Sequence, residues 1–330
     1  MLVLTSTAAW LFRRGSPAKW RTEQDALIVS DDKGRELWRK VFPAIDSAWH
    51  AGGRNGWVGD LDGDGRNEVL FAPWSGNRGT AVGPLFCYDS NGQERWRFNP
   101  GRTVRTQKEV FEPPFSVYGV SAGRLGNNGE MRVVVSSGHY LYYPAQVAIL
   151  DAKGQLLREY WHAGHLPQIL ITDLDGKGQN KLLLAGVNNA TKKATLLVLD
   201  PDAPSGSLRE NNPAYMFQGM PFANETARLL FPRSCINQLL EPLAFVFALW
   251  LMPGGITIEV RQDIHGATAS LYYQLNRDLT LESLDIGSNF ELTHSQMYSA
   301  GTLDHELNDT EVAALGDIVY SRQAVSRSHR

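Results

Sequence analysis

The chain has 330 residues and a formal net charge of -3, with 43% hydrophobic and 20% charged residues. This is ordinary globular composition, and it lacks the excess of Lys and Arg that nucleic-acid binding requires. The 31 glycines and 16 prolines favour many short strands joined by turns. Of the two cysteines, Cys87 falls in an apolar run far from Cys235, so we expect a buried thiol there and not half of a disulfide.

The N-terminal segment is mostly apolar from Leu2 to Phe12 and ends in two arginines, before a linker-like stretch over residues 15–18. A spanning helix needs about 20 apolar residues, and a signal peptide needs a basic start that is missing here. We interpret residues 1–20 as the remnant of a membrane anchor with its linker. The alternative is a loose N-terminal arm. Residues 21–330 are expected to form a single domain.

Three segments repeat one pattern, in which an apolar strand is followed by Asp, two residues, Gly and a second strand. Asp opens the turn, and Gly supplies the positive φ that a tight hairpin needs. The three segments are Leu27–Trp38, Leu85–Trp96 and Ala148–Arg158. Weaker relatives begin at Leu197 and Leu271.

A second repeated unit lies between these hairpins and leads into an inner strand. It reads Trp-His-Ala-Gly at residues 49–52 and again at 161–164, and residues 116–123 occupy the same slot in the intervening copy. With its hairpin, each copy holds four strands in roughly 50 to 60 residues, which is the make-up of a propeller blade. The sequence therefore predicts an all-β fold, a β-propeller of about five four-stranded blades, or six or seven if the last third hides others.

The C-terminal third carries fewer signals. Leu243 to Met252 is an apolar run between two prolines, and it is expected to be a buried strand because it is too short to span a bilayer. Since the first hairpin lacks inner strands before it, we expect residues near 290–320 to complete its blade and close the ring. Within that stretch, residues 309–316 have the pattern of a short capped helix.

Two kinds of repeated side chain invite a functional interpretation. Trp38 and Trp96 each follow their hairpin glycine by four residues, as in quinone-dependent propeller enzymes, but packing between blades explains them better. His50, His162 and His165 are expected on one face of the disc, where they could bind a metal or an anionic ligand. The alternative for the histidines is a shared structural hydrogen bond.

The strongest motif is the acidic loop at residues 60–68. Asp60, Asp62 and Asp64 alternate, Gly65 follows them, and Glu68 closes the loop. Carboxylates that converge on a tight turn repel one another unless a cation lies among them, and Ca²⁺ takes about six to eight oxygen ligands. The alternative is an Asx-rich turn without metal.

An EF-hand also begins with this pattern. It would need a Glu where this chain has Phe71, and it would need flanking helices where the chain has strand-like residues. The EF-hand interpretation therefore fails.

Loop and repeat together resemble the FG-GAP/VCBS family, the integrin-α-like propeller repeats. The resemblance is specific over residues 57–98, fair over 115–200 and faint beyond. The loop of that family is Asp-x-Asp-x-Asp-Gly-x-x-Asp and usually holds Ca²⁺; here Glu replaces the last Asp. The resemblance implies one Ca²⁺ with a mainly structural role. Its ligands would be the side chains of Asp60, Asp62, Asp64 and Glu68 and the backbone carbonyl of Arg66.

Two further copies of the loop are degraded. The copy at residues 173–181 keeps Asp173 and Asp175 but has Lys177 and Lys181 at the other acidic positions, so an ammonium group could replace the cation. The copy at residues 124–130 retains only its last carboxylate and is expected to be a plain turn. We therefore predict one metal site.

No nucleophile elbow, phosphate loop, paired zinc-ligand motif or kinase signature is present in the sequence. We predict a non-enzymatic module with no catalytic residues, which binds a protein, glycan or small ligand. It resembles the extracytoplasmic part, periplasmic or at the cell surface, of a bacterial membrane-anchored FG-GAP protein with a sensor- or adhesion-like role. The alternative is a propeller enzyme, either a polysaccharide lyase or hydrolase or a quinoprotein-like oxidoreductase.

Overall fold

The computed structural model describes residues 15–42, 53–74, 83–139, 143–240, 243–264 and 267–322. Within these ranges the fold is all-β, with several antiparallel sheets and a few short helices. Both the apolar segment at residues 2–12 and His50 lie outside the described residues.

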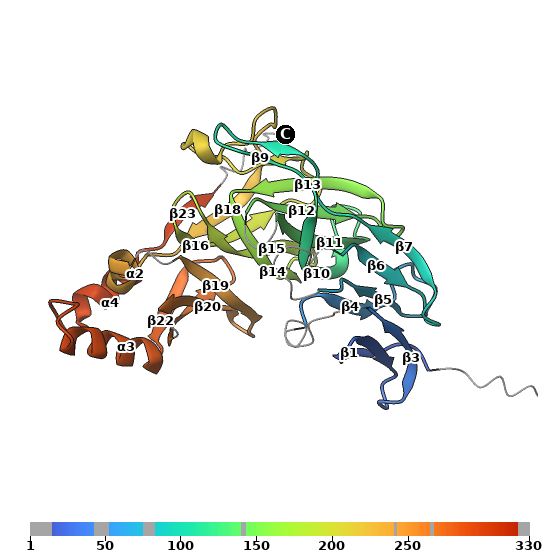
Figure 1. The fold of residues 1–330 in the computed structure, drawn as a ribbon, viewed down its shortest axis with the longest axis horizontal. Helices are drawn as coiled ribbons and strands as arrows, with labels where there is room; N and C mark the ends of the chain where they lie inside the picture. The colour runs from blue at the N-terminus through green and yellow to red at the C-terminus, as the bar shows by residue number, and fades with distance from the viewer. Residues whose placement is uncertain are drawn as a thin grey trace, which may run out of the picture.

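The sheets follow one another in chain order (Figure 1). The first contains β1 (Lys19–Glu23), β2 (Ala26–Ser30) and β3 (Glu36–Val41). The second contains β4 (Gly56–Gly59), β5 (Glu68–Phe71), β6 (Leu85–Tyr88) and β7 (Glu94–Phe98). A two-stranded ribbon follows, β8 (Val104–Arg105) and β9 (Val110–Phe111).

The third sheet contains β10 (Phe115–Leu125), β11 (Glu130–His139), β12 (Ala145–Leu150), β13 (Leu156–His162) and the short parallel strand β17 (Gly206–Ser207). The fourth contains β14 (Gly164–Thr172), β15 (Lys181–Asn188), β16 (Lys193–Leu199), β18 (Glu225–Leu230) and β23 (Val319–Arg322). The fifth contains β19 (Ala244–Leu251), β20 (Gly255–Ile264), β21 (Ala267–Asn276) and β22 (Leu281–Ile286). The helical segments are the 3₁₀ turn η1 (Pro213–Tyr215), α2 (Cys235–Leu240), α3 (Ser288–Ser299) and α4 (Asp309–Leu315).

The predicted hairpin turns are present, and one Asp organises each of them. In the first, Asp31 Oδ1 accepts hydrogen bonds from the backbone N–H groups of Lys33 and Arg35, at 3.0 and 2.9 Å. Gly34 has φ of 80°, which a residue with a side chain rarely adopts. The turns at residues 89–93 and 151–155 repeat the same bonds. The local pattern of Asp and Gly thus accounts for the bonds within these turns.

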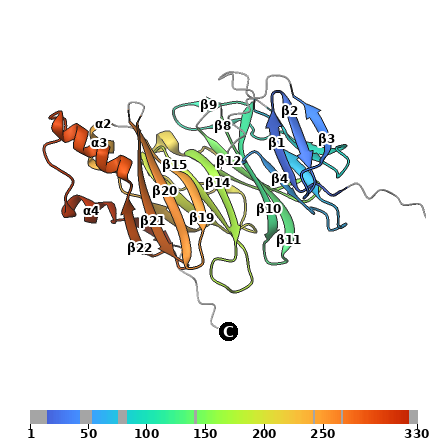
Figure 2. The same cartoon turned by 90° about the horizontal axis from the view of Figure 1, so that it is seen from below.

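Successive large sheets meet through their first strands. β10 contacts both β4 and β14, and β14 in turn contacts β19. Figure 2 shows the resulting order from below, with the β19–β22 sheet and the β1–β3 sheet toward opposite ends. Leu61, in the loop at residues 60–68, is buried in the hydrophobic cluster that the second sheet shares with the third.

Two tryptophans join neighbouring sheets. The Trp38 indole N–H donates to the backbone oxygen of Ser90 at 3.2 Å, and the Trp96 indole N–H donates to that of Ala152 at 3.1 Å. Each ring covers the turn glycine of the next sheet, where a Cβ would lie 2.8 Å or less from the ring. These contacts agree with packing between sheets as the role of both tryptophans.

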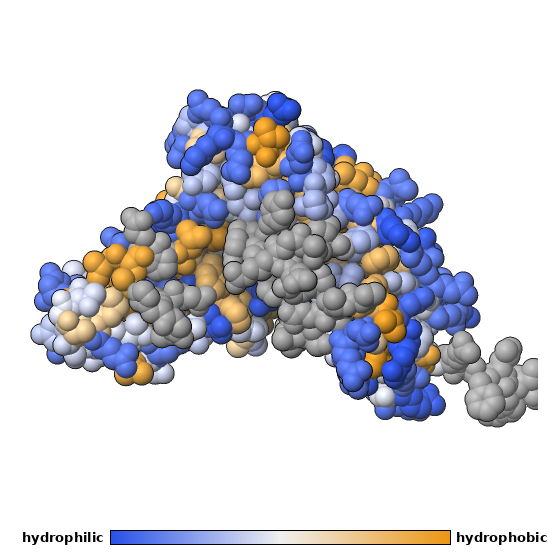
Figure 3. Space-filling view, viewed as in Figure 1, coloured by the Kyte–Doolittle hydropathy of each residue, from blue (hydrophilic) through white to orange (hydrophobic). Residues whose placement is uncertain are grey.

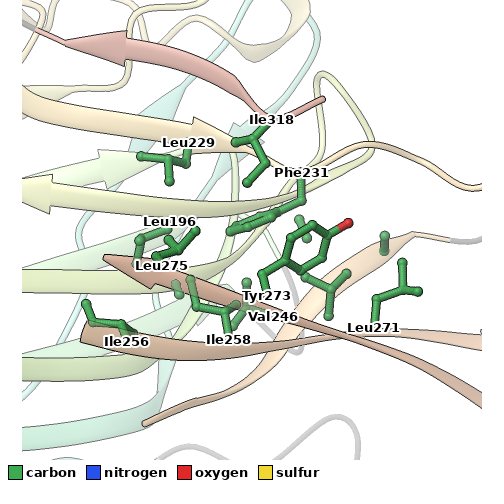
Figure 4. Packing of buried hydrophobic residues seen from close by; sticks show 14 of the residues in the cluster. Leu196, Leu229, Phe231, Val246, Ile256, Ile258, Leu271, Tyr273, Leu275 and Ile318 are labelled. Atoms are coloured by element: carbon green, nitrogen blue, oxygen red, sulfur yellow. The ribbon is translucent and has the colours of Figure 1, made fainter. Parts of the chain in front are cut away.

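The largest hydrophobic cluster lies between the fourth and fifth sheets (Figure 4). Leu196 and Leu229 from one sheet face Val246, Ile258 and Tyr273 from the other, and all five are buried. Burial of this kind contributes about 25 cal/mol per Å² of apolar surface, so this interface holds the C-terminal sheet in place.

The exposed end of β19 departs from the expectation of a buried strand, since Trp250 and Leu251 are 44% and 52% exposed. The hairpin tip extends beyond the core, and the last strand residue that packs against the cluster is Leu249.

The C-terminal residues do not complete the first sheet. β23 pairs antiparallel with β18, and most of residues 290–318 form α3, α4 and their connection. The expected closure of a ring by residues 290–320 is therefore wrong for the described residues. One edge of β18 pairs with β16, and the C-terminal strand β23 pairs with the other edge.

The helices gather at one end of the molecule, beside the fifth sheet (Figures 1 and 2). Hydrophobic atoms appear on the surface over α2, where Leu239 is 50% exposed (Figure 3). Among the helices of the described ranges, none is both long and apolar enough to cross a membrane.

Candidate metal centre

The acidic loop connects β4 to β5, and Asp60 shapes its backbone. Its Oδ1 accepts from the N–H of Gly63 at 2.7 Å and its Oδ2 from the N–H of Gly65 at 3.0 Å. Both glycines have φ near 80°, a conformation that favours glycine. The glycines therefore let the backbone wrap around a single carboxylate.

Three of the four predicted carboxylates converge. Oxygen atoms of Asp60, Asp62 and Glu68 all lie within 4.8 Å of one another. Asp64 lies outside this group, and its Oδ1 accepts from the N–H of Arg66 at 2.8 Å. The donor atoms are all oxygens, which fits a hard cation such as Ca²⁺, and the carbonyl of Arg66 lies on the same loop.

Glu68 is the buried member of the group. Only 2% of its surface is exposed, and its Oε2 accepts from the N–H of Leu61 at 2.9 Å. Burial raises the pKa of this carboxyl, against the opposing effect of the Leu61 hydrogen bond, and the nearby charge of Asp62 adds to the increase. The site therefore contains a carboxylate that needs a positive partner.

Arg95, on the outer strand β7, supplies that partner in the structure. Its Nη1 lies 2.7 Å from Asp62 Oδ2 and 3.0 Å from Glu68 Oε1. The hydrogen bond from Arg95 is the main cause that lowers the pKa of Asp62. One guanidinium thus bridges two of the converging carboxylates, in the place where a cation would bind.

Arg95 lies outside the acidic motif, although the repeats contain a signal for it. Leu37 and Leu157 occupy the equivalent position in the other two hairpins, one residue before Trp38 and Arg158. Only the repeat with the complete acidic loop has a cation there. Between loop and hairpin turn lies a hollow lined by Asp62, Asp64, Arg66, Glu68, Asp89, Ser90, Asn91 and Arg95.

The second acidic loop, between β14 and β15, has the same backbone with different charges. Asp173 accepts from the N–H groups of Lys177 and Gly178, at 3.0 and 2.8 Å. The Lys177 ammonium lies 3.1 Å from Asp175 Oδ2, and 76% of its side chain is exposed. A cation from within the loop therefore pairs with one of the two carboxylates, Asp175.

The third copy forms a turn at residues 126–129, with a backbone hydrogen bond from Gly129 N–H to Gly126 at 3.2 Å. Asp202, from a later loop, accepts from the N–H of Asn127 at 2.7 Å.

Two of the predicted ligand-face histidines, His162 and His165, lie within the described residues. His162 is completely buried, and its Nε2 lies 3.1 Å from the backbone oxygen of Val187. Burial is the main cause that lowers its pKa to about 3, so the ring is neutral at pH 7. His162 has no exposed surface to offer a ligand, and its contact is the structural hydrogen bond considered as the alternative. His165 packs edge-on against Tyr118, with ring centroids 4.2 Å apart.

A second group of potential metal ligands lies far from the acidic loop. Ligand atoms of Cys235, His294, His305 and Glu311 all lie within 4.8 Å of one another. The sequence gives little sign of this group, because Cys235, His294 and His305 are far apart and the one close pair, His305 and Glu311, matches no recognised metal-binding motif.

No protein-family model matches the chain, and a search of curated proteins finds no match. Among solved structures, the chain is similar to a protein of unknown function from Bacteroides caccae, at 12% identity and a TM-score of 0.33. The similarity covers 82% of this chain and 93% of that one.

Proposed function

We propose that the protein is a non-enzymatic, propeller-like binding module stabilised by one Ca²⁺, which acts outside the cytoplasm on a protein, glycan or small ligand. The observation that carries the proposal is the convergence of Asp60, Asp62 and Glu68 in a loop that joins the first two strands of a repeated sheet. The oxygen-only donor set and the position between the strands support a structural cation.

The propeller architecture is supported by the order of strands. In the second and fifth sheets four antiparallel strands follow one another as a meander, and the first strands of successive large sheets are neighbours. This is the plan of propeller blades. The tryptophan contacts between successive hairpins add a repeated link of the same kind.

The proposed location outside the cytoplasm follows from the expected affinity. Loops of this type in extracellular modules often bind Ca²⁺ with Kd near 10⁻⁴ to 10⁻³ M, so they are filled only where calcium is abundant. In this protein Arg95 competes for the same carboxylates, which lowers the affinity further.

Calorimetric titration of Ca²⁺ into chelator-treated protein tests the cation. We expect about one site, lost in Asp62→Ala and kept in the matched variant Asp175→Ala. Absence of heat and of any thermal shift at millimolar Ca²⁺ would overturn the proposal.

Affinity electrophoresis through gels that contain single polysaccharides tests the glycan arm of the binding role. We expect at least one polysaccharide, or an immobilised protein ligand in a parallel assay, to slow the migration of the protein. No new polysaccharide chain ends should be released. Release of reducing or unsaturated ends would favour a polysaccharide hydrolase or lyase instead.

A further inference from the structure

The second group of ligand atoms lies at the helical end of the molecule (Figures 1 and 2). Cys235 is the first residue of α2, His294 lies in α3, His305 lies in the connection that follows, and Glu311 lies in α4. Their convergence within 4.8 Å therefore joins three helices that are separate in sequence.

Glu311 is at the centre of the group. Its Oε2 lies 3.0 Å from His294 Nε2 and 3.2 Å from His305 Nε2. Its Oε1 accepts from the backbone N–H of Cys235 at 3.4 Å. Burial, followed by a hydrogen bond to Glu311, raises the pKa of the Cys235 thiol to about 12. Without a metal, one carboxylate thus collects the donors of three other residues.

His305 has a carboxylate oxygen at each ring nitrogen. Its Nδ1 lies 2.7 Å from Asp304 Oδ1, while its Nε2 faces Glu311. A neutral imidazole has only one N–H, so without metal the ring must carry a second proton to satisfy both neighbours. A metal at Nε2 removes this requirement and leaves Nδ1–H to donate to Asp304. This is the carboxylate–histidine–metal arrangement that orients histidine ligands in zinc proteins.

His294 contributes a second imidazole to the group. The side chain is completely buried, and its Nδ1 has no hydrogen-bond partner among the described residues. Its Nε2 is the ring nitrogen that faces Glu311, so a metal shared with that carboxylate would bind at Nε2 and leave the ring proton on Nδ1. Either ring nitrogen of histidine can serve as a metal ligand.

We propose that Cys235, His294, His305 and Glu311 bind one Zn²⁺, which cross-links α2, α3 and α4. One sulfur, two nitrogens and one oxygen are ligands that zinc accepts, and four protein ligands are typical of a structural site. Bond lengths of about 2.0–2.3 Å place tetrahedral ligands about 3.3–3.8 Å apart. Adjustments of about an ångström would therefore bring these atoms to that spacing.

The helices have reason to need such a link. α2 and α4 have six and seven residues, and helices this short are not stable alone in water. Their apolar contacts reach the main cluster through few side chains, such as Ile236 and Leu315. A metal that joins all three helices would fix them to one another and, through these contacts, to the fifth sheet. This site is independent of the proposed calcium loop.

Cobalt substitution tests the proposal directly. Co²⁺ titrated into chelator-treated protein should give about one site, with the near-ultraviolet charge-transfer band of a cobalt–thiolate bond. Zn²⁺ should then displace it. We expect Cys235→Ser to lose the band and Cys87→Ala, which removes the other cysteine from a separate sheet, to retain it. A band that persists in Cys235→Ser, or no binding of Co²⁺ and no zinc-dependent thermal shift in the wild-type protein, would overturn the proposal.

Substitutions at exposed residues test the proposal without disturbing the fold. Asp304 is 96% exposed in its side chain, so Asp304→Asn should leave the fold intact. We expect it to weaken Zn²⁺ binding about 10- to 100-fold, as loss of an outer carboxylate does. Glu306→Gln, the same charge change two residues away, should bind Zn²⁺ as the wild type does. Equal affinities of the two variants would contradict the assigned role of Asp304. Asp62→Ala should retain zinc, so loss of the calcium site and loss of the zinc site are separable.

Discussion

The two acidic loops, residues 60–68 and 173–181, share one backbone design but differ in where their positive charge comes from. In the second loop, Lys177 pairs with Asp175 inside the loop and remains largely exposed. In the first, Arg95 reaches in from another strand to Asp62 and to Glu68, which is only 2% exposed. An exposed pair contributes little to stability, whereas a buried carboxylate requires a partner. The comparison indicates that the last ligand position of the loop decides whether it needs a cation. This position is Glu68 in the first loop and Lys181 in the second.

Removal of Glu68 should show the largest effect. Glu68→Ala leaves the N–H of Leu61 without its acceptor and Arg95 without one of its two partners, so we expect a loss of about 2–3 kcal/mol in the free energy of unfolding. Lys181→Ala, at the equivalent position, should cost no more than about 0.5 kcal/mol. Urea unfolding in the presence of a chelator measures both. Equal losses would remove the distinction between the loops.

Arg95→Gln should have one effect on stability without calcium and a different effect on the affinity for calcium. Without calcium we expect a loss of about 1–2 kcal/mol, because Glu68 and Asp62 lose a charged partner. With calcium, the affinity measured by calorimetry should rise, since the ion no longer competes with the guanidinium. The control is Arg97→Gln on the same strand, which breaks an exposed pair with Glu94 and should leave calcium binding unchanged. Weaker calcium binding in Arg95→Gln would show that the arginine supports the site.

Acidification should act with opposite sign on two carboxyls, Glu68 of the first loop and Asp175 of the second. The pKa of Glu68 is raised in the folded protein, mainly by burial, so its contribution to stability is full below pH 4.5 and is lost as the pH rises through the folded pKa. The pKa of Asp175 is lowered, mainly by its hydrogen bond with Lys177, so its contribution is present above pH 3.8 and is lost as the pH falls. In chelator, the difference in unfolding free energy between wild type and Glu68→Gln should therefore shrink with rising pH. The difference between wild type and Asp175→Asn should grow. Parallel pH profiles would contradict this assignment.

The smallest effect is expected for Lys177→Gln. The pair that it breaks is exposed, so the free energy of unfolding should change by less than about 0.5 kcal/mol. Calorimetry should still show no calcium site in this loop, because only Asp173 and Asp175 remain as carboxylate ligands. The appearance of a second site would mean that Lys177 alone keeps calcium out.

The features that could be predicted from the sequence are those set by neighbouring residues. An Asp and a Gly three residues apart predict the hairpin turns at residues 31–34, 89–92 and 151–154, because the side-chain and backbone bonds close within five residues. The backbone of the acidic loop follows from Asp60 and its glycines in the same way. The all-β class follows from repetition of these units, since alternating strands and turns leave little room for long helices.

The tertiary structure decided which distant side chains join these local units. Arg95 reaches the acidic loop because β4 to β7 form one sheet, and the substitution of Leu by Arg in one repeat was its only trace in the sequence. The C-terminal strand joined β18 and not the first hairpin, because pairing depends on which edge is free and not on the strand's own residues. The group of Cys235, His294, His305 and Glu311 had no local signal, since its members come together only when three short helices pack beside the fifth sheet. A sequence determines local geometry through bonds between near neighbours, whereas sites assembled across long loops depend on packing that no single segment encodes.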